Sequence, residues 1–159
     1  MTDDNTENKM AAGSAGGMQA VVSLLKKDNA ADSLLEAACV ALKNMTVDTE
    51  IGKAAGRAGG VQAVVSLLNK DNAANRLLEA ACWALRIMTF DNTENQKAEG
   101  RAGGMQAVFS LLKKDNAADS LLQAACGALQ NMTVDTEIGK AAGSAGGGVE
   151  VVVSLLEEG

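Results

Sequence analysis

Apolar residues between positions 33 and 45 recur every three or four residues, which is the spacing of one face of an α-helix. When this segment is drawn as a helix, the apolar face is formed by Leu34, Leu35, Ala38, Leu42 and Met45. The opposite face is more polar and consists of Ser33, Glu36, Val40, Lys43 and Asn44. The pattern predicts an amphipathic helix, and such a helix needs a neighbouring element to cover its apolar face.

This helix belongs to a repeat that organises the whole chain. The segment Gly-Gly-Met-Gln-Ala-Val at 16–21 returns, with one change, at 59–64 and unchanged at 103–108, and a degenerate copy begins at Gly147. The phase advances by 43, 44 and 44 residues, and 16–58 differs from 103–145 at only five positions, which chance does not produce. We expect a single domain, 1–159, with three units and a partial fourth, bounded approximately at 1–47, 48–90, 91–134 and 135–159.

The sequence pattern of each unit predicts three helices. In the second unit they cover about 49–57, about 61–70 and from after residue 72 to about 89. Glycines weaken the first of these helices. Gly59 and Gly60 are expected to turn the chain, since glycine adopts positive φ freely, and Asp71-Asn72 is expected to cap the third helix. The chain has no proline and no alternating apolar runs, so the expected fold is all-α.

Two segments of the repeat resemble the armadillo family. One is Gly-Gly-Met-Gln-Ala-Val-Val-Ser-Leu-Leu (16–25), and the other is Leu-Glu-Ala-Ala-Cys-Val-Ala-Leu-Lys-Asn-Met (35–45). They look like the family's Gly-Gly turn, its Val-x-Leu-Leu second helix and its Ala-x-Trp-Ala-Leu-x-Asn third helix. HEAT repeats are the alternative, but they typically carry a proline that this chain lacks. The resemblance covers essentially the whole chain and implies an α-solenoid, a right-handed superhelix whose third helices line a concave groove.

The resemblance also implies a peptide-binding site in that groove. In this family a Trp and an Asn, four residues apart on the third helix, hold an extended peptide by its side chains and its backbone respectively. The Trp positions here are Val40, Trp83 and Gly127, and the Asn positions are Asn44, Ile87 and Asn131. No unit has both residues, so the ladder is broken in every unit. The other candidates on this face are Ser33, Glu36, Arg76, Glu79, Ser120 and Gln123.

Composition narrows the range of functions. The chain has no histidine, which excludes histidine-based triads and metal sites, and we expect no catalytic residue, metal or cofactor. A net charge of −6 argues against nucleic-acid binding, which needs an excess of Lys and Arg. No apolar run approaches the roughly 20 residues of a membrane span, and the acidic N-terminus does not look like a signal peptide. We therefore expect no membrane partner and a cytoplasmic or nuclear protein.

Two further motifs have structural interpretations. Cys39, Cys82 and Cys126 are spaced like the repeat, and each follows Ala-Ala, so we expect one small buried position that recurs three times rather than a disulfide framework or a metal site. The Gly-rich segment 56–60 lacks the Lys-Ser/Thr of a P-loop, and it is expected to be a turn between helices.

Two functional hypotheses remain. In the first, the chain is a non-enzymatic scaffold that binds an extended peptide or protein segment; Trp83 anchors it, Glu36 and Glu79 favour a basic side chain, and the Asn side chains bind its backbone. The alternative is a structural or engineered repeat fragment without a ligand, which self-associates as a homodimer or end to end through an uncapped helix near its C-terminus. The residues expected to form that contact are Val149, Val152, Val153, Leu155 and Leu156.

Overall fold

The computed structural model describes residues 16–132 of the chain, and this part contains eight helices. They are α2 (Gly17–Leu25), α3 (Asp32–Met45), α4 (Thr49–Arg57), α5 (Gly60–Leu68), α6 (Asn75–Thr89), α7 (Thr93–Ala102), α8 (Gly104–Leu112) and α9 (Asp119–Met132). No strand occurs between residues 16 and 132. The expected all-α class is confirmed, and the three helices of the second unit begin and end within two residues of their predicted bounds.

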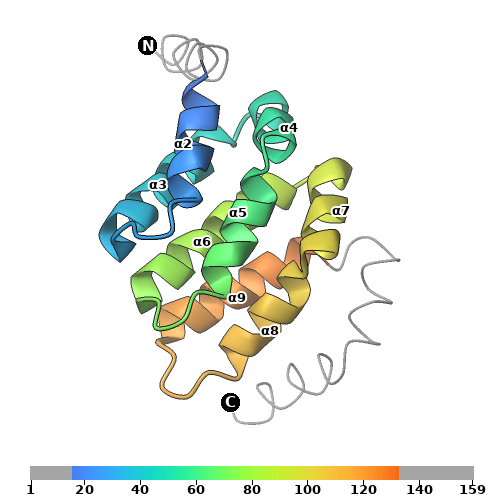
Figure 1. The fold of residues 1–159 in the computed structure, drawn as a ribbon. Helices are drawn as coiled ribbons and strands as arrows, with labels where there is room; N and C mark the ends of the chain where they lie inside the picture. The colour runs from blue at the N-terminus through green and yellow to red at the C-terminus, as the bar shows by residue number, and fades with distance from the viewer. Residues whose placement is uncertain (1–15, 133–159) are drawn as a thin grey trace, which may run out of the picture.

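The helices are arranged in two layers, with the short first helices along one edge (Figure 1). The second helices α2, α5 and α8 contact one another in order, and the third helices α3, α6 and α9 do the same in the other layer. Each second helix packs on the third helix of its own unit, and α4 contacts α7. Every unit is therefore covered mainly by its neighbours along the stack, as in an α-solenoid.

Glycine turns join the first and second helices of the second and third units. Gly59 has a φ of 87° and Gly103 has a φ of 77°, both in the left-handed region that favours glycine. The backbone N–H of Gly59 donates to the carbonyl of Gly56, and Gly103 donates in the same way to Gly100. These turns confirm the predicted role of the Gly-Gly pair.

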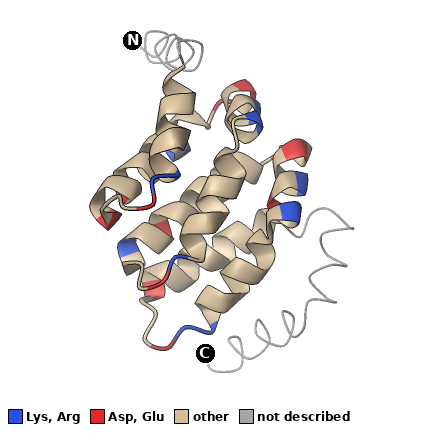
Figure 2. Ribbon diagram, viewed as in Figure 1, with Lys and Arg blue, Asp and Glu red and all other residues tan. Residues whose placement is uncertain are grey.

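The charged residues avoid the layer of second helices. α2, α5 and α8 contain no charged residue, whereas α4, α7 and the loops between second and third helices carry many (Figure 2). Val61, Val64 and Val108 in this layer are completely buried. The second helices thus form an uncharged layer whose apolar side packs on the third helices.

The start of the third helix differs from the prediction, because Asp71-Asn72 does not cap α6. Asn72 lies in a turn with a φ of 56°, and the residue before α6 is Ala74, which has no capping side chain. Its backbone N–H instead donates to Oδ2 of Asp32, 2.7 Å away in the preceding unit, and Lys70 Nζ bonds the same carboxylate. The hydrogen bonds from Lys70 and Ala74 lower the pKa of Asp32. A neighbouring unit therefore provides the partner that the local sequence does not.

Two positions of the predicted core differ between units. Leu34 is 44% exposed, although Leu77 and Leu121 at the same repeat position are 0% exposed. Cys39 and Cys82 are buried, but Cys126 is exposed, which corrects the expectation that all three cysteines are buried. The cause is position in the stack: α6 lies between two third helices, whereas α3 and α9 have a third helix on one side only among residues 16–132.

Glu99 of α7 is a buried carboxylic acid in the apolar interior. It is 0% exposed, and neither oxygen has a hydrogen-bond partner of good geometry in the described part of the chain. Burial raises its pKa to about 7, and the backbone N–H of Met105, at the start of α8, opposes this effect. A Cβ atom on Gly104 would lie 2.3 Å from Oε1, so the glycine makes room for the carboxyl group. The equivalent residue of the preceding unit is Ala55, so this acid is peculiar to one repeat.

The cysteines provide a test of this arrangement. We expect a thiol-alkylating reagent to modify Cys126 in the native protein and to leave Cys39 and Cys82 unmodified, because burial raises the pKa of both to about 12 and shields them. Mass spectrometry of proteolytic peptides identifies the modified residue. Unfolding in denaturant is the control, since all three should then react. Fast native modification of Cys39 or Cys82 would contradict the packing of α3 against α6.

Glu99 predicts a pH-dependent stability. Its pKa is about 7 in the folded protein and near 4.5 when unfolded, so unfolding is favoured progressively as the pH rises from 4.5 to 7. Glu99→Gln removes this pH dependence. The free energy of unfolding of the variant, minus that of wild type, should therefore be about 3 kcal/mol larger at pH 8 than at pH 4.5. Denaturant unfolding at both pH values measures the difference. Glu50→Gln, at an exposed site of α4, is the matched control; if both variants behave alike, Glu99 is not buried as a neutral acid.

Candidate functional site

The candidate groove residues lie on the accessible side of the third helices. Ser33, Val40, Asn44, Arg76, Ser120 and Gln123 are exposed, and Glu36, Glu79, Trp83, Ile87, Gly127 and Asn131 are half-buried. The apolar stripe on the other side of the same helices is buried, with Leu35, Leu42 and Leu85 at 2% exposure or less. The twelve residues are therefore accessible to a partner, as a binding face requires.

A pocket of about 320 Å³ between α3 and α6 brings several of these residues together. It is lined by Glu36, Val40, Lys43, Arg76, Glu79, Ala80 and Trp83. Each helix provides one carboxylate and one cation to it, so the lining combines an aromatic ring with alternating charge. Ser33 and Asn44 of α3, and the candidates of α9, are not part of this pocket.

Trp83 has different surroundings on its other side. The guanidinium of Arg86 lies over the indole ring, 5.1 Å from its centroid, in the geometry of a cation–π contact. A Cβ atom on Gly127 would lie 3.2 Å from Nη1 of Arg86, so the arginine also reaches α9. Arg86 thus occupies the space between Trp83 and the next third helix. The sequence analysis did not identify this role, although an Arg three residues after a Trp on a helix is a usable signal.

The two candidate asparagines are not equivalent. Nδ2 of Asn131 donates to the backbone carbonyl of Arg86, 2.8 Å away in the preceding unit. Asn44 is exposed and makes no such bond among residues 16–132. Ile87, between them in the stack, has no amide. A continuous row of free amides facing a peptide backbone is therefore absent from this part of the chain.

Sequence reasoning missed a second pocket at the C-terminal ends of the third helices. It measures about 350 Å³, and its lining includes Thr46, Val47, Ile87, Phe90, Asn92 and Asn131. Val47 is 66% exposed and Phe90 is 68% exposed. They occupy the same repeat position, two residues after the Met that ends the apolar stripe, and an apolar residue recurring in a predicted loop was the available signal.

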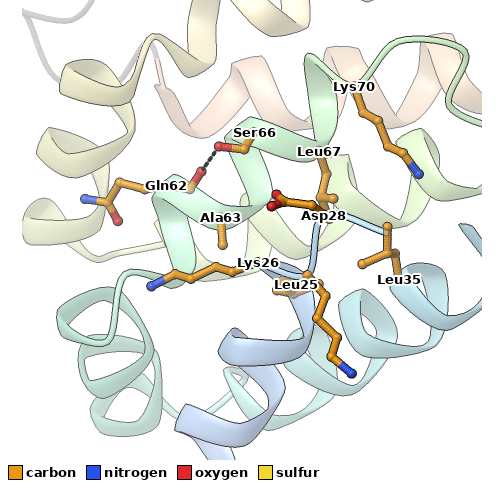
Figure 3. A pocket seen from close by; sticks show the side chains of 10 residues that line it. Leu25, Lys26, Asp28, Leu35, Gln62, Ala63, Ser66, Leu67 and Lys70 are labelled. Carbon is orange, nitrogen blue, oxygen red and sulfur yellow. Dashed lines mark hydrogen bonds between the residues drawn. The ribbon is translucent and has the colours of Figure 1, made fainter. Parts of the chain in front are cut away.

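The largest of these pockets is lined by three lysines, Lys26, Lys27 and Lys70, two of which have partners in a neighbouring unit. It measures about 370 Å³ and lies among α2, α3 and α5 (Figure 3). The side chains of Lys26 and Lys70 point in opposite directions there, so their charges do not converge. Lys26 donates to the carbonyl of Ala58 at 3.4 Å, and Lys70 is paired with Asp32. Lys26 and Lys70 thus link neighbouring units.

No candidate for metal binding arises in the described residues. No group of three or more Cys, Asp or Glu side chains between residues 16 and 132 is placed to hold a metal ion. Within the same range, no helix is long and apolar enough to cross a membrane.

Comparison with known proteins identifies the family. The armadillo/β-catenin-like repeat matches residues 5–47 and 53–90, which together make up just over half of the chain. The chain belongs to the armadillo repeat family. No curated protein sequence matches it.

Several similar solved structures are engineered or designed proteins. One engineered protein is 31% identical, with a TM-score of 0.84 over 95% of this chain and 59% of its own length. A designed armadillo repeat protein in complex with the peptide (KR)4 is 25% identical, with a TM-score of 0.83 over 96% of this chain and 62% of its own. A third, also an engineered protein, is 32% identical, with a TM-score of 0.82 over 94% of this chain and 35% of its own. The chain thus spans less than two thirds of the length of each of these proteins, and the solenoid fold is shown.

Trp83 is the only tryptophan, which makes the arginine contact measurable by fluorescence. Arg86→Ala should expose one face of the ring, shift its emission to longer wavelength and increase quenching by acrylamide. Arg76→Ala is the matched control, since Arg76 lines the pocket on the other side without lying over the ring. If both variants leave the spectrum unchanged, Arg86 does not cover the indole in solution.

Proposed function

We propose that this armadillo repeat protein binds an extended peptide across the third helices, with a basic side chain in the pocket between Val40 and Trp83. The observation that carries the proposal is the pocket itself, in which a half-buried indole lies beside the carboxylates of Glu36 and Glu79. An aromatic face and carboxylates both attract a guanidinium or ammonium group. The basic peptide bound by a designed relative supports the same choice of ligand.

The cations in this pocket restrict the kind of peptide that we propose as the ligand. Lys43 and Arg76 line the same pocket, so its carboxylates are partly balanced, and a long run of basic residues would meet these cations. Arg86 covers the other side of Trp83. We therefore propose recognition centred on one basic residue, with weak salt-dependent affinity, rather than a series of equal pockets.

Peptide titration tests this function. A peptide of alternating Lys and Arg should bind more tightly than an acidic peptide of the same length, and higher salt should weaken binding. Trp83→Ala should reduce affinity by about tenfold or more, because aromatic anchors contribute roughly 1–2 kcal/mol or more in interfaces. Glu36→Gln with Glu79→Gln should reduce both affinity and its salt dependence. Gln62→Ala, on the exposed face of α5, is the control.

Preference for the acidic peptide, or indifference to Trp83→Ala, would refute the groove proposal. A second candidate is then favoured, a scaffold that has no peptide ligand and associates with itself. The incomplete Trp and Asn rows, and the internal use of Asn131 and Arg86, support this alternative. The C-terminal contact expected from Val149 to Leu156 lies outside the described residues and stays a prediction.

A further inference from the structure

The pocket at the C-terminal ends of the third helices lies at the same junction between units as the pocket beside Trp83. One wall comes from the end of α3 and the start of α4, and the other comes from the end of α6, so both walls lie inside the described stack. Trp83 lines one pocket and Ile87 lines the other, and these residues are one turn apart on α6. The two pockets therefore adjoin successive turns of one helix.

Three polar side chains that line the pocket near Ile87 are already hydrogen-bonded within the protein. The hydroxyl of Thr46 donates to a backbone carbonyl of α3 at 2.8 Å, and the amide of Asn131 donates to the carbonyl of Arg86 at 2.8 Å. Oδ1 of Asn92 accepts a backbone N–H of α7 at 3.1 Å. These groups offer few free hydrogen bonds to a ligand.

Arg86 is the one charged residue of this lining, and its guanidinium is directed elsewhere. The group lies over the Trp83 ring, and a Cβ atom on Gly127 would lie 3.2 Å from its Nη1. The accessible surface of the pocket is mainly apolar, because Val47 is 66% exposed and Phe90 is 68% exposed. The volume of about 350 Å³ is more than a leucine or phenylalanine side chain needs.

We propose that the peptide bound beside Trp83 places an apolar side chain in this second pocket, and that this residue is the immediate neighbour of the basic one. The inference rests on the function proposed above. Successive side chains of an extended segment point to opposite sides. A backbone that crosses α6 between Trp83 and Ile87 therefore directs one side chain toward the carboxylates of the first pocket. It directs the next side chain toward Val47 and Phe90, whose exposed apolar surface it buries.

Two peptides of the same composition and length test this specificity. One contains Leu-Arg-Leu and the other contains Leu-Ser-Arg-Ser-Leu, in a background of serine and glycine. In the first peptide the leucines point away from the arginine, whichever direction the chain runs, and in the second they point to the same side as the arginine. By fluorescence anisotropy of labelled peptides, the first should bind about fivefold more tightly or better, because only its leucine reaches the second pocket.

The combined variant Val47→Ser and Phe90→Ser should remove this preference without disturbing the fold, because both side chains are largely exposed. Leu34→Ser is the matched control, since Leu34 is also an exposed apolar residue of this part of the chain but lines neither pocket. A preference that persists in the combined variant would overturn the proposal. Tighter binding of an Asp-Arg-Asp peptide would also overturn it, because the second pocket would then select a carboxylate near Arg86.

Trp83→Ala separates the two levels of the argument. Binding of both leucine peptides that does not change in Trp83→Ala would refute the proposed function itself. Equal affinities that both fall in Trp83→Ala would refute the apolar pocket alone. Photo-leucine in the Leu-Arg-Leu peptide locates the contact, and its crosslinks should fall within 46–49 or 86–92. Crosslinks confined to the second helices would place the leucine elsewhere and contradict the proposal.

Discussion

The third helix of each unit has apolar residues on two sides, one facing the preceding unit and one facing the following unit. A single unit cannot bury both sides. Only α6 has a third helix on each side among residues 16–132, and only α6 buries both flank residues, with Leu77 and Cys82 at 0% exposure. Burying one leucine contributes on the order of 2 kcal/mol, so every added neighbour stabilises the helix that it covers. Stability in this chain is therefore a property of the junctions between units, and the terminal third helices are the least satisfied.

Apolar contacts between helices of small residues tolerate sliding, whereas hydrogen bonds of fixed geometry do not. Several polar links join successive units here, among them Lys70 to Asp32, Asn131 to the Arg86 carbonyl, and Asn95 to the Gly52 carbonyl at 2.9 Å. Asn95 is 2% exposed, and its amide also donates to the carbonyl of Met88 at 2.8 Å. Such buried or half-buried links specify one register between units, a role that polar groups fill better than methyl groups do.

The periodicity of the sequence was sufficient to predict the helices, because each apolar stripe and each Gly-Gly turn is a local signal. Features that depend on a neighbouring unit were not predictable in the same way. The backbone N–H before α6 is bound by Asp32, which lies more than forty residues earlier, so Asp71-Asn72 only resembled a cap. Leu34 and Cys126 stand in local sequences similar to those of their buried counterparts, but each lies on a third helix that has another third helix on one side only among residues 16–132. Glu99 stood at a recognisable core position, and comparison with Ala55 would have identified it.

The candidate groove was predictable in outline and not in detail for a related reason. Helical periodicity predicts that its residues lie on the face opposite the apolar stripe. Their contacts with one another, however, depend on the spacing between third helices. Gly127 leaves room that Arg86 takes, and the guanidinium over Trp83 therefore lies on the side of the ring that faces α9. The remaining pocket, between α3 and α6, then lies between a valine and the indole. A repeat protein with a row of equal pockets gains affinity from many weak contacts, whereas the function proposed above places recognition at one junction. For that proposed function, the charges of Glu36, Lys43, Arg76 and Glu79 matter more to specificity than the length of the bound segment does.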